Sequence, residues 1–159
     1  MRMGKTHNKL TAFKQIKNVG LDITNLTLDH VVYQASSSQD YDRLISVCFK
    51  LANQIHEKII GGRRVAIFKL YEPFIYQKYS ISALELIEPK NGQVCDSAYQ
   101  HAEFIAQKPF EKYGEEYPNI NWDTSSMNRS KFSHLKLNFE NGLTLKFLQK
   151  PIVELVSND

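Results

Sequence analysis

The strongest constraint on the fold is a degenerate internal repeat. Residues 28–89 predict a strand, a helix and three further strands, and residues 98–152 predict the same order with a much shorter helix. Each half ends in an apolar strand followed by a proline, at Pro89 and at Pro151. The chain has 159 residues, which is the length of a single domain. The repeat therefore predicts two βαβββ units that share one α+β core.

The hydrophobic period changes along the first half of the chain. Residues 28–35 are rich in strand-forming side chains, and His30, Val32 and Gln34 fall on one side of the predicted strand. Apolar residues then recur at steps of three and four, which predicts a helix over residues 40–57.

Glycine and proline mark the turns of the predicted strands. The Gly61-Gly62 pair separates two apolar runs and predicts a hairpin. Pro73 is expected to end the second strand of that hairpin. In the second half, Asn141-Gly142 is a strong signal for another hairpin turn.

A helical arm precedes the repeat. Residues 6–17 have apolar side chains at helical spacing. We therefore divide the chain into an arm, residues 1–20, and a paired-module domain, residues 21–159. Within that domain, module one covers residues 28–89 and module two covers residues 98–152, where the helix has shrunk.

The net charge of +3 belongs to the arm. Residues 1–18 hold no acidic side chain, and the rest of the chain is slightly acidic. The basic side chains of the arm are too spread out for a nucleic-acid stripe, so they indicate a solvated helix face. They are Arg2, Lys5, Lys9, Lys14 and Lys17.

The composition is that of an ordinary globular protein. No apolar run reaches the roughly 18 residues of a membrane span, and the first residues have no apolar segment typical of a secretory signal. The two cysteines are too few for a disulfide framework. We therefore expect a cytoplasmic protein that binds neither a membrane nor nucleic acid.

Three side chains are candidate metal ligands. His30 and His101 stand early in predicted strands and Glu85 stands late in one. Two imidazoles and a carboxylate suit Zn, Fe, Ni or Mn. Their spacing matches no short zinc motif, so buried structural histidines are the alternative interpretation.

Glu103 lies two residues after His101 and therefore on the same face of its strand. A carboxylate inside a core must be paired or metal-bound. Glu103 is thus a candidate ligand, a partner that orients a histidine, or a general base. The alternative is a solvated side chain at a sheet edge.

Basic residues offer a second kind of site. Lys146 and Leu148 share a strand face, and a pairing of Lys146 with Glu85 or Glu103 would give a salt-bridged pocket in place of a metal site. Arg64 and Lys69 on the first hairpin are candidates to anchor an anionic substrate, with surface solvation as the alternative.

Segments spread over residues 20–152 together resemble the YecM family, which has the vicinal oxygen chelate fold of glyoxalase-like proteins. The segments are GLDITNLTLDHV, IIGGRRVAIFKLYEP, SALELIEP and QHAEFI. The resemblance implies paired βαβββ modules that form a curved mixed sheet around a cavity, plus an extra N-terminal helix. The cavity of this fold often holds a divalent metal.

Carried onto this sequence, the resemblance implies His30, Glu85 and His101 as ligands. The fourth ligand position falls at Leu148, where YecM-like sequences carry a histidine and where a leucine cannot bind a metal.

Two functions follow as expectations. In the first, a divalent metal acts as a Lewis acid on neighbouring oxygens of a small substrate, with Glu103 as proton carrier. Isomerase, lyase and dioxygenase chemistry all occur on this scaffold. In the second, Leu148 marks a decayed metal site, and the cavity binds a small molecule without catalysis, through Lys146, Glu85 and aromatic residues. A monomer and a homodimer fit either function.

Overall fold

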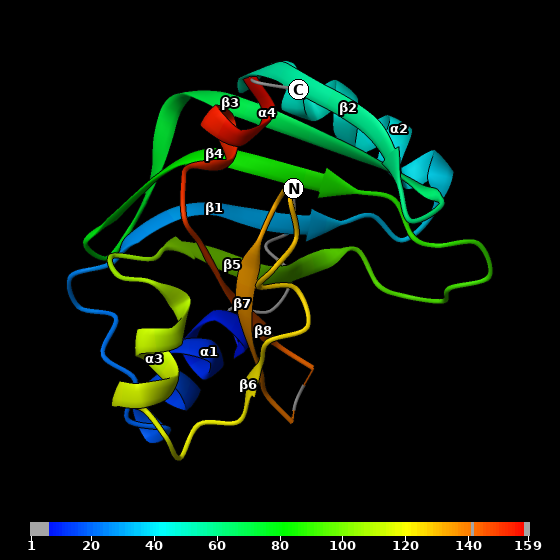
Figure 1. Ribbon diagram of the computed structural model, residues 1–159. Helices are drawn as coiled ribbons and strands as arrows, with labels where there is room; N and C mark the ends of the chain where they lie inside the picture. Colours follow the sequence, from blue (N-terminus) through cyan, green and yellow to red (C-terminus); the bar gives the residue numbers. More distant parts are fainter. Residues whose placement is uncertain (1–6, 141, 158–159) are drawn as a thin grey trace.

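One curved, mixed sheet of eight strands runs through the molecule, in the order β2-β3-β4-β1-β5-β8-β7-β6 (Figure 1). The computed structural model describes residues 7–140 and 142–157, and the side chains of these residues from Phe13 onward. The first module comprises β1 (Thr27–Gln34), α2 (Ser38–Cys48), β2 (Ala52–Ile60), β3 (Arg63–Tyr76) and β4 (Tyr79–Ile87). The second comprises β5 (Ala98–Ile105), α3 (Phe110–Glu116), β6 (Trp122–Asp123), β7 (His134–Asn138) and β8 (Thr144–Leu148). Helices α1 (His7–Asn18) and α4 (Ile152–Ser157) flank the two modules.

The two modules meet at their first strands. β1 is parallel to β4 and β5 is parallel to β8, whereas β1 and β5 pair antiparallel at the middle of the sheet. This arrangement confirms the predicted α+β fold of paired βαβββ units, including the short helix of the second module. The division into residues 1–20 and 21–159 stays a prediction.

The strand register brings the polar candidates into two neighbouring rows. In one row, His30 lies opposite Glu103, and Glu103 lies opposite Lys146. In the next row, Val32 lies opposite Glu85 of β4 on one side and opposite His101 of β5 on the other. Since neighbouring strands are about 4.8 Å apart, the side chains of these rows reach one another.

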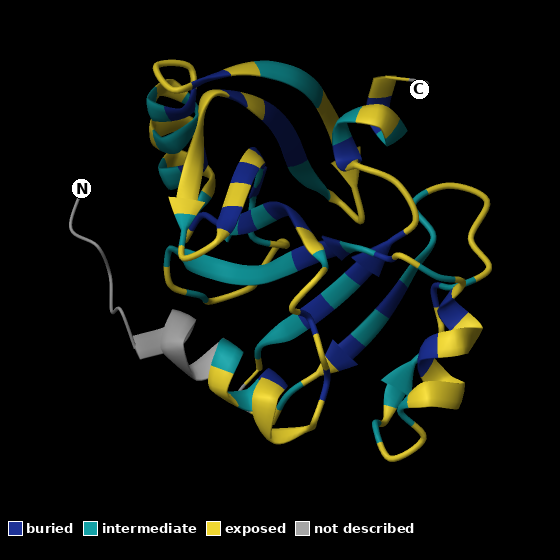
Figure 2. Ribbon diagram, turned by 90° about the vertical axis from the view of Figure 1, so that its left-hand side faces the viewer, coloured by how far each residue is buried: buried dark blue, intermediate teal, exposed yellow. Residues whose placement is uncertain are grey.

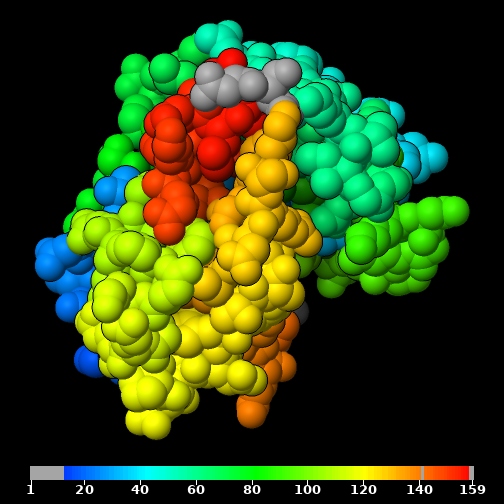
Figure 3. Space-filling view, viewed as in Figure 1, coloured from blue at the N-terminus to red at the C-terminus, as the bar shows by residue number. Residues whose placement is uncertain are grey.

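The sheet has two different faces. The inner face, as we call the side that carries His30, also carries Ile67 and Ala83, which pack against Ile152 and Val156 of α4. Figures 1 and 3 show α4, in red, beside the segment that precedes β7, in gold. This short helix therefore covers part of the inner face.

The opposite face carries most of the apolar core. In the first module, Ala66 and Phe68 alternate with the inner-face residues of β3 and pack with Tyr41 and Cys48 of α2. A larger cluster in the second module includes Phe104 and Phe147, and it extends to Ile16 of α1. Figure 2 shows buried residues along the central strands and exposed residues at the outer loops.

The helix predicted over residues 6–17 is confirmed as α1, His7–Asn18. Phe13 stacks on Tyr76 and Tyr79, with ring centroids 5.5 and 5.8 Å apart. Arg2, Lys5 and the side chain of Lys9 lie outside the described residues. None of the helices described in the structure is both long and apolar enough to span a membrane.

The helix predicted over residues 40–57 is too long. α2 ends at Cys48, and the chain turns at Leu51 into strand β2. The register shift between Gln54 and His56 disturbs the alternation of β2, so its apolar spacing imitates a helix. His56, which the same pattern placed on the helix, therefore lies on a strand.

The predicted hairpins are present, but one strand end differs. Gly61 and Gly62 have φ values of +60° and +79°, which a two-residue hairpin turn requires. β7 and β8 pair antiparallel across the second turn, of which Asn141 lies outside the described residues. Pro73 does not end β3, because a register shift between Lys69 and Phe74 removes the proline from the ladder. α4 has no counterpart in the sequence prediction.

Candidate functional site

The centre of the site is His30, whose side chain is fully buried in the inner face. Its Nδ1 lies 2.7 Å from Oδ2 of Asp29. Neighbouring residues of a strand normally face opposite ways, but the β1–β5 register shifts between Leu28 and His30, which brings both side chains to one side. Oδ2 of Asp29 accepts a hydrogen bond from the Nδ1–H of His30, so it orients the ring and directs Nε2 into the site.

Nε2 of His30 has no hydrogen-bond partner in the described part of the chain, although it is buried. It faces two carboxylates: Oε1 of Glu103 is 3.7 Å away and Oε2 of Glu85 is 3.8 Å away. Burial disfavours the protonated ring, but Glu103, Asp29 and Glu85 outweigh this effect and raise the pKa of His30. The surroundings of Nε2 thus favour a positive charge at this point.

Glu103 is the most heavily bonded carboxylate of the cluster. Its Oε1 accepts hydrogen bonds from Nε2 of His101 at 2.9 Å and from Nζ of Lys146 at 3.0 Å. Burial alone would raise the pKa of Glu103, but His30, His101 and Lys146 hold it well below its ordinary value. Glu103 is therefore ionised at neutral pH and joins three basic side chains.

The pKa values of Glu85 and His101 are shifted in the directions that burial favours. Burial and the nearby charge of Glu103 raise the pKa of Glu85, although His30, Lys146 and Arg63 partly offset the effect. Burial lowers the pKa of His101 despite its hydrogen bond to Glu103. His101 is therefore a neutral imidazole at neutral pH, with its Nε2–H directed at Glu103.

The donors around Nε2 of His30 are of the types that bind divalent ions, but they are more widely spaced than the ligands of a metal site. Ligands at about 2.0–2.2 Å from one metal ion lie roughly 3 to 3.5 Å apart, and the two carboxylates are 3.7 and 3.8 Å from Nε2. Among the described residues, no three His, Cys, Asp or Glu side chains already surround a common point as a metal site does. The competing cation is Lys146, which occupies an oxygen of Glu103.

Three other candidates from the sequence lie outside this cluster. Leu148 is buried against Ile67 and Ile152, in the apolar contact between β8 and α4. Arg64 faces the opposite side of the sheet, where it bonds Glu88 and Asp42. Lys69 is exposed on β3, where it lies opposite Ala83 of β4. Ala83 therefore separates it from His30 of β1.

Sequence reasoning missed Asp29 and Arg63. Arg63 shares the inner face with Val65 and Ile67; the two-residue period of β3 predicts that these residues share a face, but it does not predict which face of the sheet this is. It lines an open pocket of about 570 Å³ together with Lys90 and His101. No comparable sequence signal marks Asp29, because only the register shift in β1 turns it inward.

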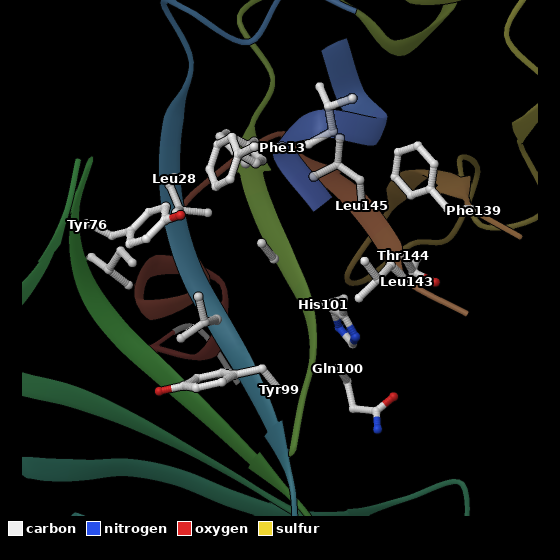
Figure 4. A pocket seen from close by; sticks show the side chains of 15 residues that line it. Phe13, Leu28, Tyr76, Tyr99, Gln100, His101, Phe139, Leu143, Thr144 and Leu145 are labelled. Carbon is white, nitrogen blue, oxygen red and sulfur yellow. The ribbon is translucent and has the colours of Figure 1, made fainter. Parts of the chain in front are cut away.

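A second pocket, apolar and about 110 Å³ in volume, lies on the other side of the sheet (Figure 4). Phe13, Leu28, Val31 and Leu145 line it, and His101 stands at its polar end. None of its described lining residues is a carboxylate, so the ionisable cluster belongs to the inner face.

Two curated relatives resemble part of the chain. Protein YecM of Escherichia coli is 29% identical over 92 residues, which cover 56% of this chain and 47% of that protein. An uncharacterised protein of Haemophilus influenzae is 21% identical over 89 residues and covers the same shares. The chain thus spans about half the length of the curated relatives it matches.

Solved structures show the same fold. A structural-genomics structure of protein EC4020 has a TM-score of 0.76 at 23% identity, covering 94% of this chain and 86% of that one. A methylmalonyl-CoA epimerase in complex with methylmalonyl-CoA has a TM-score of 0.56 at 12% identity, covering 80% and 96%. A Streptomyces coelicolor methylmalonyl-CoA epimerase has a TM-score of 0.55 at 13% identity, covering 78% and 97%.

These likenesses agree with the paired modules of the sheet, which have the vicinal oxygen chelate arrangement. The model of the YecM protein family matches residues 6–154, almost the whole chain. This chain is therefore a member of the YecM family with the vicinal oxygen chelate fold.

Proposed function

We propose that this protein binds a divalent metal ion on the inner face and acts there on a small oxygenated substrate. One observation carries the proposal: the buried, unpartnered Nε2 of His30 faces Glu85 and Glu103 while Asp29 holds the other nitrogen. A carboxylate behind a histidine is a common support of a metal ligand. The raised pKa of His30 agrees with this, because surroundings that favour a proton on Nε2 also favour a metal cation there.

In this proposal His30, Glu85 and Glu103 are the ligands, and Zn, Fe, Ni and Mn all suit these donors. Glu103 would supply a ligand oxygen in place of the fourth ligand, whose position Leu148 occupies. When bound, the ion polarises oxygen atoms of the substrate as a Lewis acid. A bound ion would also displace Lys146 from Glu103, since the two cations compete for one oxygen.

His101 is the group best suited to move a proton. Its lowered pKa leaves it neutral at neutral pH, and its Nε2–H donates to Glu103, so that Nδ1 carries a free lone pair. It also lines the open pocket. We assign the proton transfer to His101, with Glu103 orienting its ring, because the low pKa of Glu103 makes that carboxylate a weak base. Proton abstraction next to a polarised carbonyl, as in an isomerase or a lyase, is the reaction class that these groups support.

A small acyl compound is compatible with the fold, because a methylmalonyl-CoA epimerase of the same architecture binds methylmalonyl-CoA. That likeness concerns the fold alone. The cytoplasmic location and the choice between monomer and homodimer stay predictions from the sequence.

A metal-free binding pocket is the second candidate. Nζ of Lys146 lies 3.0 Å from Oε1 of Glu103, so the cluster already contains a cation that neutralises this carboxylate. In such a pocket a small polar molecule would bind to Lys146 and Glu85, without catalysis.

Metal analysis separates the two candidates. The protein is purified without a histidine tag, its metal content is measured by elemental analysis, and Zn²⁺, Mn²⁺ and Ni²⁺ are titrated. The first candidate predicts one ion per chain and an affinity at least tenfold lower in His30→Ala, Glu85→Gln and Glu103→Gln, with His56→Asn as the matched control. Sub-stoichiometric metal in the natural protein, unchanged by these substitutions, would support the metal-free pocket.

A further inference from the structure

We propose that the open pocket beside the proposed metal site holds an anionic group of the substrate, a carboxylate or a phosphate, between Arg63 and Lys90. The inference deepens the proposed function by naming the substrate class, and it rests on that function for the chemistry next to His101. Binding of the anion itself requires no metal.

Arg63 stands at the end of the inner face, at the start of β3. It is half-buried and lines the open pocket together with His101. Within residues 7–140 and 142–157, its guanidinium forms no ion pair or side-chain hydrogen bond. A half-buried guanidinium without an internal partner has five donors to offer to a ligand.

The neighbouring Arg64 shows the contrast. Its guanidinium lies 2.9 Å from Oε1 of Glu88 and 2.6 Å from Oδ1 of Asp42, and it stacks over the ring of Tyr41. That arginine is neutralised by carboxylates and stabilises the fold. The two adjacent arginines therefore have different roles, and only Arg63 faces the site.

The rest of the pocket is also suited to an anion. Cations and amide side chains line it, and none of its lining residues in the described part of the chain is a carboxylate. Its polar lining residues are Gln34, Arg63, Lys90, Asn91, Gln93, Gln100 and His101. A tight turn fixes Lys90, because its backbone N–H donates to Gln93 Oε1 at 3.0 Å and its carbonyl accepts from Gln93 N–H at 2.9 Å.

The strand register sets the length of the substrate. Arg63 precedes Ile67 by four residues, and Ile67 lies opposite Glu85. Four residues of a strand span roughly 13 Å, and the arginine side chain covers much of this distance. A compound of a few carbon atoms, with an oxyanion at one end and a carbonyl or hydroxyl at the other, would reach from Arg63 to the metal site.

Titration of the metal-free protein with inorganic phosphate and with malonate tests the inference, with calorimetry and amide NMR shifts of Gly92 and Gln93 as readouts. Arg63→Gln and Lys90→Gln should each weaken binding about tenfold, the loss of one charge-assisted contact. Lys50→Gln, an exposed lysine outside the pocket, is the matched control and should bind as the natural protein does. The stronger of the two probes identifies the group as a carboxylate or a phosphate.

Equal anion binding in the natural protein, Arg63→Gln and Lys90→Gln would overturn the inference, as would a loss caused by Lys69→Gln alone. If Arg63→Gln folds poorly, Arg63→Lys and Lys90→Gln keep the test intact. His30→Ala separates this inference from the proposed function, because anion binding should persist in that variant while metal binding is lost. Anion binding that depends on Arg63 in a protein that takes up no metal would refute only the metal site.

Discussion

Asp29 and His30 act as one unit although they are consecutive residues of a strand. Oδ2 of Asp29 lies 2.7 Å from Nδ1 of His30, and the same oxygen accepts a hydrogen bond from the backbone N–H of Ile152 at 2.9 Å. One carboxylate therefore orients the central imidazole and holds the first residue of α4. The geometry of the site and the position of the helix that covers it are thus linked.

Replacing Asp29 by asparagine should weaken both functions of this carboxylate. We expect a 10- to 100-fold loss of metal affinity, the usual effect of removing a partner behind a histidine ligand. We also expect a loss of about 1–3 kcal/mol in the free energy of unfolding, because a buried hydrogen-bond group loses its charge-assisted bond. Competition titration and urea unfolding measure the two effects. Asp96→Asn, at an exposed carboxylate away from the site, is the control, and unchanged metal affinity in Asp29→Asn would show that the pair has no functional role.

Leu148 should prove to be a packing residue. It is 2% exposed and belongs to the apolar cluster of Ile67, Ile152 and Val156. Leu148→Ala should lower the free energy of unfolding by about 2–5 kcal/mol and leave metal affinity within twofold of the natural protein. Chemical denaturation and metal titration check this. A variant of normal stability with altered metal affinity would instead place Leu148 in the site.

Acid should remove the contribution of the Glu88–Arg64 pair to stability. The hydrogen bond from Arg64 lowers the pKa of Glu88 to about 2. Because the folded-state pKa is depressed, the contribution is complete above the ordinary value of 4.5 and is lost as the pH falls toward 2. Allowing for solvent screening, we expect Glu88→Gln to cost about 1 kcal/mol at pH 6.

The difference between Glu88→Gln and the natural protein should become small as the pH falls toward 2, where about half of the folded molecules carry a protonated Glu88 carboxyl. Urea unfolding at several pH values measures it, with Glu111→Gln as an exposed control. A difference that stays constant between pH 6 and pH 2 would contradict the assignment.

The two thiols should react at different rates. Cys48 is buried on α2, and burial raises the pKa of its thiol to about 11. Cys95 is partly exposed in the loop between the modules. In the folded protein a thiol reagent should therefore modify Cys95 first and Cys48 only at the rate of unfolding. Cys95→Ser should leave a single slow thiol, and a fast thiol in that variant would contradict the packing of α2.

The sequence predicted those parts of the fold that depend on local chemistry. The glycine pair at residues 61–62 and the period of two on either side marked the first hairpin correctly. The β2 strand was misread as helix because a bulge near Ile55 breaks its alternation. The end of β3 was misplaced because the bulge that carries Pro73 out of the ladder depends on tertiary pairing.

The site was predictable along each strand but not between strands. The period of two placed His101 beside Glu103, and the structure joins them by a hydrogen bond. The register between strands has no local signal, and it is the register that sets Glu103, rather than His101, opposite His30. Arg64 was named as a candidate and Arg63 was missed for the same reason, since the sequence does not show which face of β3 is turned toward Glu85.

The most direct test of the central claim is to locate a metal ion in the protein. Crystals grown with Zn²⁺ or Mn²⁺ would be examined by anomalous diffraction at the absorption edge of the metal. The proposal predicts a peak at bonding distance from Nε2 of His30, about 2.0–2.1 Å, in contact with Glu85 and Glu103, and with Lys146 moved away from Glu103. A peak elsewhere, or no peak at His30 with the Lys146–Glu103 pair intact, would contradict it.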